Sequence, residues 1–188
     1  NMKISRAILL VAAVPFLVAL FFSSQMIIKE MHTVKQLSKL EQLTNLSVKM
    51  ANLVHEQQKE RGATAVFVGS MGGKFRAELL AQRAETNKQR EALKSYLKGF
   101  KPGDYDAVFN EQYSALLAEL DKMDGIRSKV DELSISAANA IGYYTGLNGQ
   151  NLALIGYMAN LSPDPDVVTS IMGYTNFMQG KERAGIER

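Results

Sequence analysis

Apolar residues recur every three or four positions along most of this chain, which is the spacing of one face of an α-helix. No proline interrupts the longest stripe, which comprises Val34, Leu37, Leu40, Leu43, Leu46, Met50 and Leu53. The stripe predicts a long helix that ends near Gly69. Glycines at positions 69, 72 and 73 supply the stop signal that is typical of a helix C-terminus.

The same spacing predicts further helices downstream, separated by short turns. Their expected ranges are about 74–98, 104–133 and 135–161, and a last helix runs from about 165 to the end of the chain. Asp104 and Asp164 are suitable N-caps, and Pro165 suits the first position of the last helix. Long helices with short connections predict an all-α fold, an antiparallel up-down helical bundle of the four-helix-bundle type.

The N-terminal region differs from the rest because residues 7–22 carry no charge and the uncharged stretch continues to Ile28. A helix of about 22 such residues can cross a hydrocarbon core of roughly 30 Å. Lys3 and Arg6 precede it, as expected for a cytoplasmic start. We therefore expect a cytoplasmic segment 1–6, a transmembrane signal anchor 7–28 and an extracytoplasmic domain 29–188. A cleavable signal peptide is the alternative, although no small-x-small cleavage pattern follows the apolar run.

The composition disfavours several classes of function. The net charge is +3 and the basic residues are dispersed, which gives little support to nucleic acid as a partner. The chain has no cysteine, so it has neither disulfides nor thiolate metal sites. The segment HEQQK at 55–59 has Lys59 where a zinc protease motif needs its second histidine. We expect no cofactor, no metal site and no enzymatic activity.

Arg61 stands in an apolar stripe, because Val54, Arg61 and Val68 are seven residues apart. No carboxylate lies three or four positions from Arg61, where a partner on the same helix would have to be. Arg188 likewise has none behind it, whereas Arg183 has Glu187 at the i+4 position. The pattern predicts that Arg61 and Arg188 approach the interior of the bundle.

The last helix gives a similar indication, because Ile171, Tyr174 and Met178 continue at three-four spacing to Lys181, Gly185 and Arg188. Gly62 and Gly185 leave room beside the arginines. An unpaired buried charge costs several kcal/mol, so something must compensate it.

Two compensators are open at this point. One is a glutamate from another helix, with Glu60, Glu182 and Glu187 as candidates. The other is a small planar anion held between guanidinium groups, whose forked donors suit oxyanions. Lys181 could add a charge and Tyr143 or Tyr144 a hydroxyl to such a site, although these tyrosines also suit an ordinary core.

Several segments together resemble the NIT domain, the nitrate- and nitrite-sensing module of bacterial receptors and regulators. They are QKERGATAVF on the first helix, YYTGLN at 143–148, a turn containing Asp-Pro, and the closing KERAGIER. The resemblance covers about residues 35–188. It implies an all-helical sensor of packed four-helix bundles that binds nitrate or nitrite through arginines, here Arg61, Arg188 and Arg183.

An anchor ahead of such a domain resembles a chemoreceptor, such as a methyl-accepting chemotaxis protein, or a sensor kinase. The resemblance implies a bacterial inner-membrane protein with its sensor domain in the periplasm, and we expect a homodimer. A second span and a cytoplasmic signalling module are expected beyond residue 188. Binding of the anion would draw the first and last helices together and pass a helix shift across the membrane.

The predicted ligand-binding residues are Arg61, Arg188, Arg183, Lys181, Gly62 and Tyr143. The alternative is a membrane-anchored bundle that senses another small solute or a protein partner, with its arginines in structural salt bridges.

Overall fold

The computed structural model of the protein describes residues 2–162 and 165–186, with side chains from residue 15 onward except Val167 and Ile186. These residues form helices and no strand, which confirms the all-helical prediction. The elements are α1 (Met2–Gly69), α2 (Arg76–Leu97), the 3-10 turn η1 (Pro102–Asp104), α3 (Ala107–Asp121), α4 (Met123–Asp131), α5 (Ala137–Asn160) and α6 (Pro165–Ile186).

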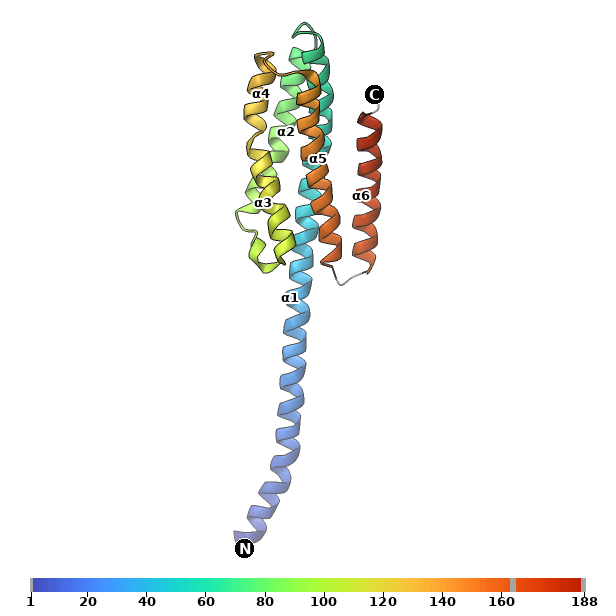
Figure 1. The fold of residues 1–188 in the computed structure, drawn as a ribbon. Helices are drawn as coiled ribbons and strands as arrows, with labels where there is room; N and C mark the ends of the chain where they lie inside the picture. The colour runs from blue at the N-terminus through green and yellow to red at the C-terminus, as the bar shows by residue number, and fades with distance from the viewer. Residues whose placement is uncertain (1, 163–164, 187–188) are drawn as a thin grey trace. The chain divides into compact units, whose positions relative to one another are not determined.

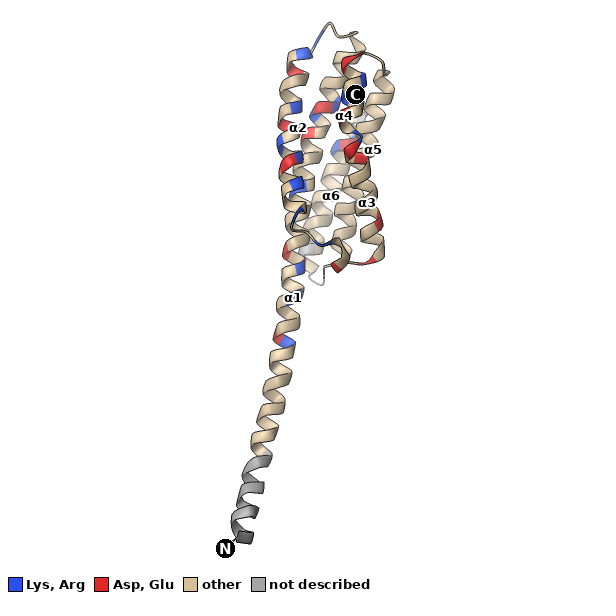
Figure 2. Cartoon of the chain, turned by 90° about the vertical axis from the view of Figure 1, so that its left-hand side faces the viewer, with Lys and Arg blue, Asp and Glu red and all other residues tan. Residues whose placement is uncertain are grey.

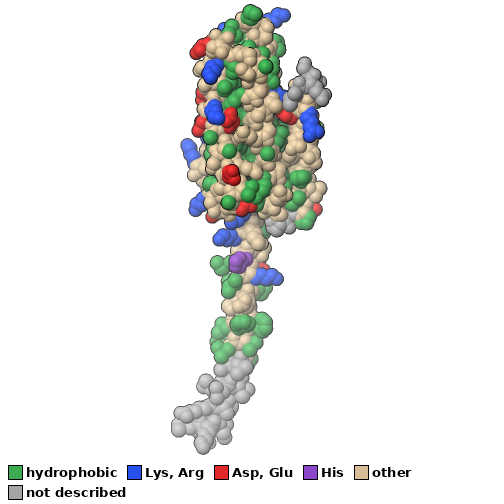
Figure 3. Space-filling model, in the orientation of Figure 1, with side chains coloured by type: hydrophobic (Ala, Val, Ile, Leu, Met, Phe, Trp, Pro, Cys, Tyr) green, Lys and Arg blue, Asp and Glu red, His purple; other side chains and the backbone are tan. Residues whose placement is uncertain are grey.

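The chain divides into two units, of which the first comprises residues 1–41. In this unit the described side chains from residue 15 to residue 38 are all exposed, and many of them are hydrophobic (Figure 3).

The predicted transmembrane anchor, 7–28, falls partly on residues 7–14, whose side chains lie outside the described part of the chain. No helix in the described residues is long and apolar enough to cross a membrane. The predicted placement in the bacterial inner membrane, with the sensor domain in the periplasm, is therefore wrong.

The second unit, 42–188, contains the rest of α1 and all later helices. In this unit α1, α2, the successive α3 and α4, and α5 lie side by side, and α6 packs beside α5 (Figure 1). The third predicted helix is in fact two, because α3 ends at Asp121 and α4 begins at Met123. Charged residues gather on α2 and α4, whereas α5 carries none (Figure 2). As a result, α5 contributes mainly apolar and small polar side chains to the interior.

The ends of the helices agree with local sequence signals in most places. Helix α1 ends at Gly69 as predicted, and Gly72, with a φ of +79°, donates its backbone N–H to the Phe67 carbonyl. The prediction that Asp104 caps the next helix is wrong. Residues 102–104 form η1 instead, and Asp106 accepts the Phe109 N–H at 2.8 Å. The predicted cap Asp164 lies outside the described residues.

Helix α5 begins with a serine cap, since the Ser136 hydroxyl accepts the Asn139 N–H at 3.2 Å. Ser136→Ala should lower the free energy of unfolding by about 1 kcal/mol, because it leaves a helix N-terminal donor without its partner. The matched control is Ser128→Ala, in the interior of α4, where alanine is the better helix former and the change should be near zero or slightly favourable. Urea unfolding of both variants measures this. Equal losses in the two variants would contradict the cap.

Candidate functional site

A layer of polar side chains crosses the interior of the second unit between two apolar clusters. On α1, the buried residues on one side run from Leu43 to Val54 and those on the other side are Ala63 and Phe67. The buried polar layer between and beside them comprises Gln57, Glu60, Arg61, Thr64, Arg83, Thr86, Arg90, Arg127, Tyr144, Asn148 and Asn151. So much buried charge requires specific pairing, because an ionised group without a partner is strongly disfavoured in the interior.

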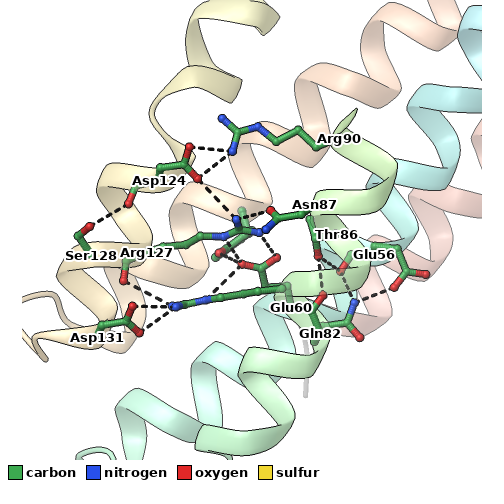
Figure 4. A network of polar contacts seen from close by, with 12 residues as sticks. Glu56, Glu60, Gln82, Thr86, Asn87, Arg90, Asp124, Arg127, Ser128 and Asp131 are labelled. Carbon is green, nitrogen blue, oxygen red and sulfur yellow. Dashed lines mark hydrogen bonds and ion pairs between the residues drawn. The ribbon is translucent and has the colours of Figure 1, made fainter. Parts of the chain in front are cut away.

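Glu60 lies at the centre of this layer and has no solvent exposure. Arg127 on α4 donates to both carboxylate oxygens, from Nε to Oε1 and from Nη2 to Oε2, each at 2.8 Å (Figure 4). The Tyr144 hydroxyl on α5 donates to Glu60 Oε1 at 2.7 Å. This bidentate arrangement joins α1, α4 and α5 through one carboxylate.

The electrostatic effects follow from this geometry. Burial disfavours the Arg127 cation, but the hydrogen bonds and charge of Glu60 outweigh burial and raise the pKa of Arg127. Burial and the Glu60 charge together raise the pKa of Tyr144, so its hydroxyl stays protonated as a donor.

Two arginines on α2 are paired at the rim of the same layer. Arg83 Nη1 donates to both Asp131 carboxylate oxygens at 2.8 Å. Arg90 Nη1 donates to the two oxygens of Asp124 at 2.8 and 2.9 Å (Figure 4). Hydrogen bonding from Arg90 holds the pKa of Asp124 below its ordinary value despite partial burial. Arg83 and Arg90 therefore form salt bridges that connect α2 to α4.

The charged layer on α2 was missed at the sequence level, although a signal for it exists. Leu79, Arg83, Thr86, Arg90 and Leu93 are the buried residues of α2 and alternate in steps of four and three. The same three-four spacing predicted that Arg61 points inward. On α2 it predicts that Arg83 and Arg90 do so as well.

Arg61 lies next to Glu60 on α1 but points toward α6. It is 6% exposed, as its place in the apolar stripe predicts. Its Nη1 donates to the Thr145 hydroxyl on α5 at 2.8 Å and forms an ion pair with Glu182 Oε1 on α6. The Gln58 amide donates to the other oxygen of Glu182 at 2.7 Å. Of the two compensators left open by the sequence, the structure therefore contains the glutamate.

The inward face of α6 differs from the predicted one. Beyond Ile171, the residues that turn inward are Thr175, Met178 and Glu182, whereas Tyr174 and Lys181 are exposed. Both series have three-four spacing from Ile171, so spacing alone could not choose between them. The observed register places Glu182 rather than Lys181 against Arg61.

A cavity of about 490 Å³ opens beside the Arg61 guanidinium. Its walls come from α1 and α6 and comprise Gln58, Lys59, Arg61, Gly62, Lys181, Ala184 and Gly185. A Cβ at Gly185 would lie 2.8 Å from Arg61 Nη2, so a glycine there lets the guanidinium reach α6. Three cationic side chains, those of Lys59, Arg61 and Lys181, thus line one cavity, and this concentration of positive charge suits an anion. Among the described residues, no cluster of histidine and carboxylate groups could hold a metal ion.

The predicted ligand residues are only partly brought together. Arg61, Gly62 and Lys181 line the cavity. Arg183 is exposed and does not line it, and Tyr143 donates its hydroxyl to the Glu119 carbonyl on α3 at 2.8 Å. Arg188 lies outside the described residues.

Lys181 also contacts α1 at the outer edge of the cavity, where its Nζ lies 2.8 Å from His55 Nδ1. This contact requires a neutral imidazole that accepts at Nδ1. Burial and the charge of Lys181 lower the pKa of His55 from its ordinary 6.5, and the nearby Glu56 only partly opposes them.

Comparison with known proteins connects this architecture to a family. The family model for nitrate and nitrite sensing matches residues 52–188. The chain is similar to the nitrate regulatory protein of Klebsiella oxytoca, with 27% identity over 154 residues, which is 82% of this chain and 39% of that protein. It is also similar to the structure of the NasR transcription antiterminator, with a TM-score of 0.77 and 26% identity over 81% of this chain and 41% of that one. The chain therefore spans about two fifths of the length of these relatives, and neither is named as an enzyme or a chemotaxis receptor.

Removing the central carboxylate should be costly. Glu60→Ala leaves the Arg127 cation and the Tyr144 hydroxyl buried without their partner, so the free energy of unfolding should fall by about 3–5 kcal/mol. The control Glu85→Ala removes an exposed carboxylate from α2 and should change it by less than about 0.5 kcal/mol. Chemical denaturation measures both. A loss at Glu60 no larger than the loss at Glu85 would contradict the pairing scheme.

His55 should make stability depend on pH. Its folded pKa is lowered, so the unfolded chain binds more protons as the pH falls through 6.5, and the free energy of unfolding should fall with it. His55→Gln removes this contribution, so its stability should fall less steeply than that of the wild type between about pH 7 and pH 5. Denaturation series at several pH values give the two slopes. Indistinguishable slopes would contradict the lowered pKa of His55 in the folded protein.

Proposed function

Because the chain belongs to the nitrate and nitrite sensing family, we propose that the cavity beside Arg61 receives nitrate or nitrite as a sensory ligand. The observation that carries this proposal is a buried guanidinium at the wall of a cavity that Lys59 and Lys181 also line. A sensor of this kind binds its ligand without chemical change.

The chemistry of the cavity suits a small planar oxyanion. A guanidinium donates two parallel charge-assisted hydrogen bonds to such an anion, and these bonds are stronger than neutral ones. Partial burial strengthens the attraction further, because the local dielectric is lower than that of water. Lys59 and Lys181 add positive potential at the mouth of the cavity without fixing an orientation.

The family resemblance proposes Arg188 as a second arginine at this site. Arg188 follows Gly185 by three positions in the sequence, and Gly185 is the residue that meets Arg61 across the cavity. Arg183 is a weaker candidate, because it is exposed away from the cavity.

The signal is proposed to be a change in how α6 is held against α1. Arg61 and Gln58 on α1 contact Glu182 on α6, so a ligand that binds between them alters this tie directly. A ligand shifts such an equilibrium only by its differential affinity for the two arrangements.

One observation favours a second function. The Arg61–Glu182 ion pair has the geometry of a structural salt bridge between two helices. Such a bridge suits a helical bundle that senses another solute or holds a protein partner. The two functions differ in one respect, since only the first requires Arg61 to bind an external anion.

Isothermal titration of the protein with nitrate and nitrite tests the proposal. Arg61→Ala should weaken binding at least about tenfold, because charge-assisted hydrogen bonds contribute about 1.5–3 kcal/mol. The control Arg76→Ala removes an exposed arginine on α2 that stacks on Phe67, and it should leave the affinity unchanged. Chloride and sulfate should bind more weakly than either ligand. Absence of nitrate and nitrite binding to the wild type, or an unchanged affinity in Arg61→Ala, would contradict the proposal.

A further inference from the structure

We propose that the Glu182 carboxylate occupies the position of the external anion, so that nitrate or nitrite must displace Glu182 from Arg61 in order to bind. This inference rests on the proposed function and adds to it the ligands of the site and the control of its affinity. It makes Gln58 an anion-binding residue and Thr145 a positioning residue for Arg61.

The geometry of the Glu182 carboxylate matches that of the external anion. A carboxylate is a planar group with two equivalent oxygens, and nitrate and nitrite are planar anions whose oxygens are equivalent in the same way. Glu182 uses one oxygen for Arg61 Nη1 and the other for Gln58 Nε2, at 2.7 Å. Donors that already hold one planar oxyanion between them need no rearrangement to hold another.

The charge of Arg61 is already balanced by Glu182. Arg61 and Glu182 neutralise each other, and both are almost fully buried, at 6% and 7% exposure. An additional anion at Arg61 would place two negative charges beside one guanidinium in a region of low dielectric, where like charges repel strongly. The anion therefore replaces Glu182 at Arg61.

The other cations of the cavity are engaged elsewhere. Lys59 forms an ion pair with Glu56 at 2.6 Å, and Lys181 contacts His55 at 2.8 Å. Both of these partners lie on α1. Arg61 is the cation of the cavity that pairs with a carboxylate on α6, so exchange at Arg61 removes this ion pair between the two helices.

The competition from Glu182 lowers the sensitivity of the site to its ligand. Since the protein must first release Glu182, its apparent affinity for the anion is lower than the intrinsic affinity of the donors by the fraction of molecules in which they are free. Glu182 acts as a built-in competitor that sets the ligand concentration at which the site responds. It also holds α6 against α1 until the anion arrives.

The competing carboxylate can be removed by one substitution, Glu182→Gln, which keeps the size of the side chain and removes its negative charge. Titration of the full chain with nitrate and nitrite should show at least about tenfold tighter binding in Glu182→Gln than in the wild type. Glu56→Gln is the matched control, because Glu56 is a carboxylate near the same cavity that does not contact Arg61. It corrects for a general gain of positive potential, and the tightening in Glu182→Gln should exceed that in Glu56→Gln at least about tenfold.

Two further variants keep the test decisive. Glu182→Asp retains the charge on a shorter side chain that cannot span both donors, so it should tighten binding to an intermediate degree even if Glu182→Gln folds poorly. Gln58→Ala in the Glu182→Gln background should weaken anion binding, because it removes a ligand and not a support of Glu182.

The outcomes separate the two proposals. If neither the wild type nor Glu182→Gln binds nitrate or nitrite, the proposed function fails and this inference fails with it. If the wild type binds but Glu182→Gln and Glu182→Asp bind no more tightly, the proposed function stands and the competitor role of Glu182 is overturned.

Discussion

The pairing of buried charge across the middle of a helical core is the constraint on which this structure depends. Glu60 has no exposure, and its two oxygens accept three hydrogen bonds from Arg127 and Tyr144. A buried ion pair of this kind adds little net stability over apolar residues, but breaking it is strongly destabilising. Its effect is to fix the register of α1 against α4 and α5. Arrangements that leave Glu60 unpaired are excluded by their energy.

The candidate site uses the neighbours of this network. Arg61 follows Glu60 on α1, and Thr145 follows Tyr144 on α5. Because neighbouring residues of a helix point in different directions, the two pairs form separate contacts. Glu60 and Tyr144 join the interior network, whereas Arg61 and Thr145 meet on the side of α6. The contact between Glu60 and Tyr144 therefore fixes the positions of Arg61 and Thr145. The guanidinium of Arg61 is therefore presented to the cavity by a rigid frame, while its partner Glu182 comes from α6.

The sequence predicted the features that depend on periodicity and on local stop signals. The helical class, the end of α1 at Gly69 and the inward direction of Arg61 all follow from spacing within one helix. The register of α6 could not be predicted, because Tyr174 and Thr175 offer equally good three-four series from Ile171. Choosing between them requires knowing which side chain meets Arg61. The break between α3 and α4 and the cap at Asp106 likewise depend on packing and local backbone geometry.

The central claim is that an external planar anion takes the place of Glu182 on Arg61. A crystal structure of the protein grown with saturating nitrate tests this claim most directly. We expect a planar anion within hydrogen-bonding distance of the Arg61 guanidinium and the Gln58 amide, with the Glu182 carboxylate turned away from both. A structure in which Glu182 still contacts Arg61 and the cavity holds only water at saturating nitrate would contradict it.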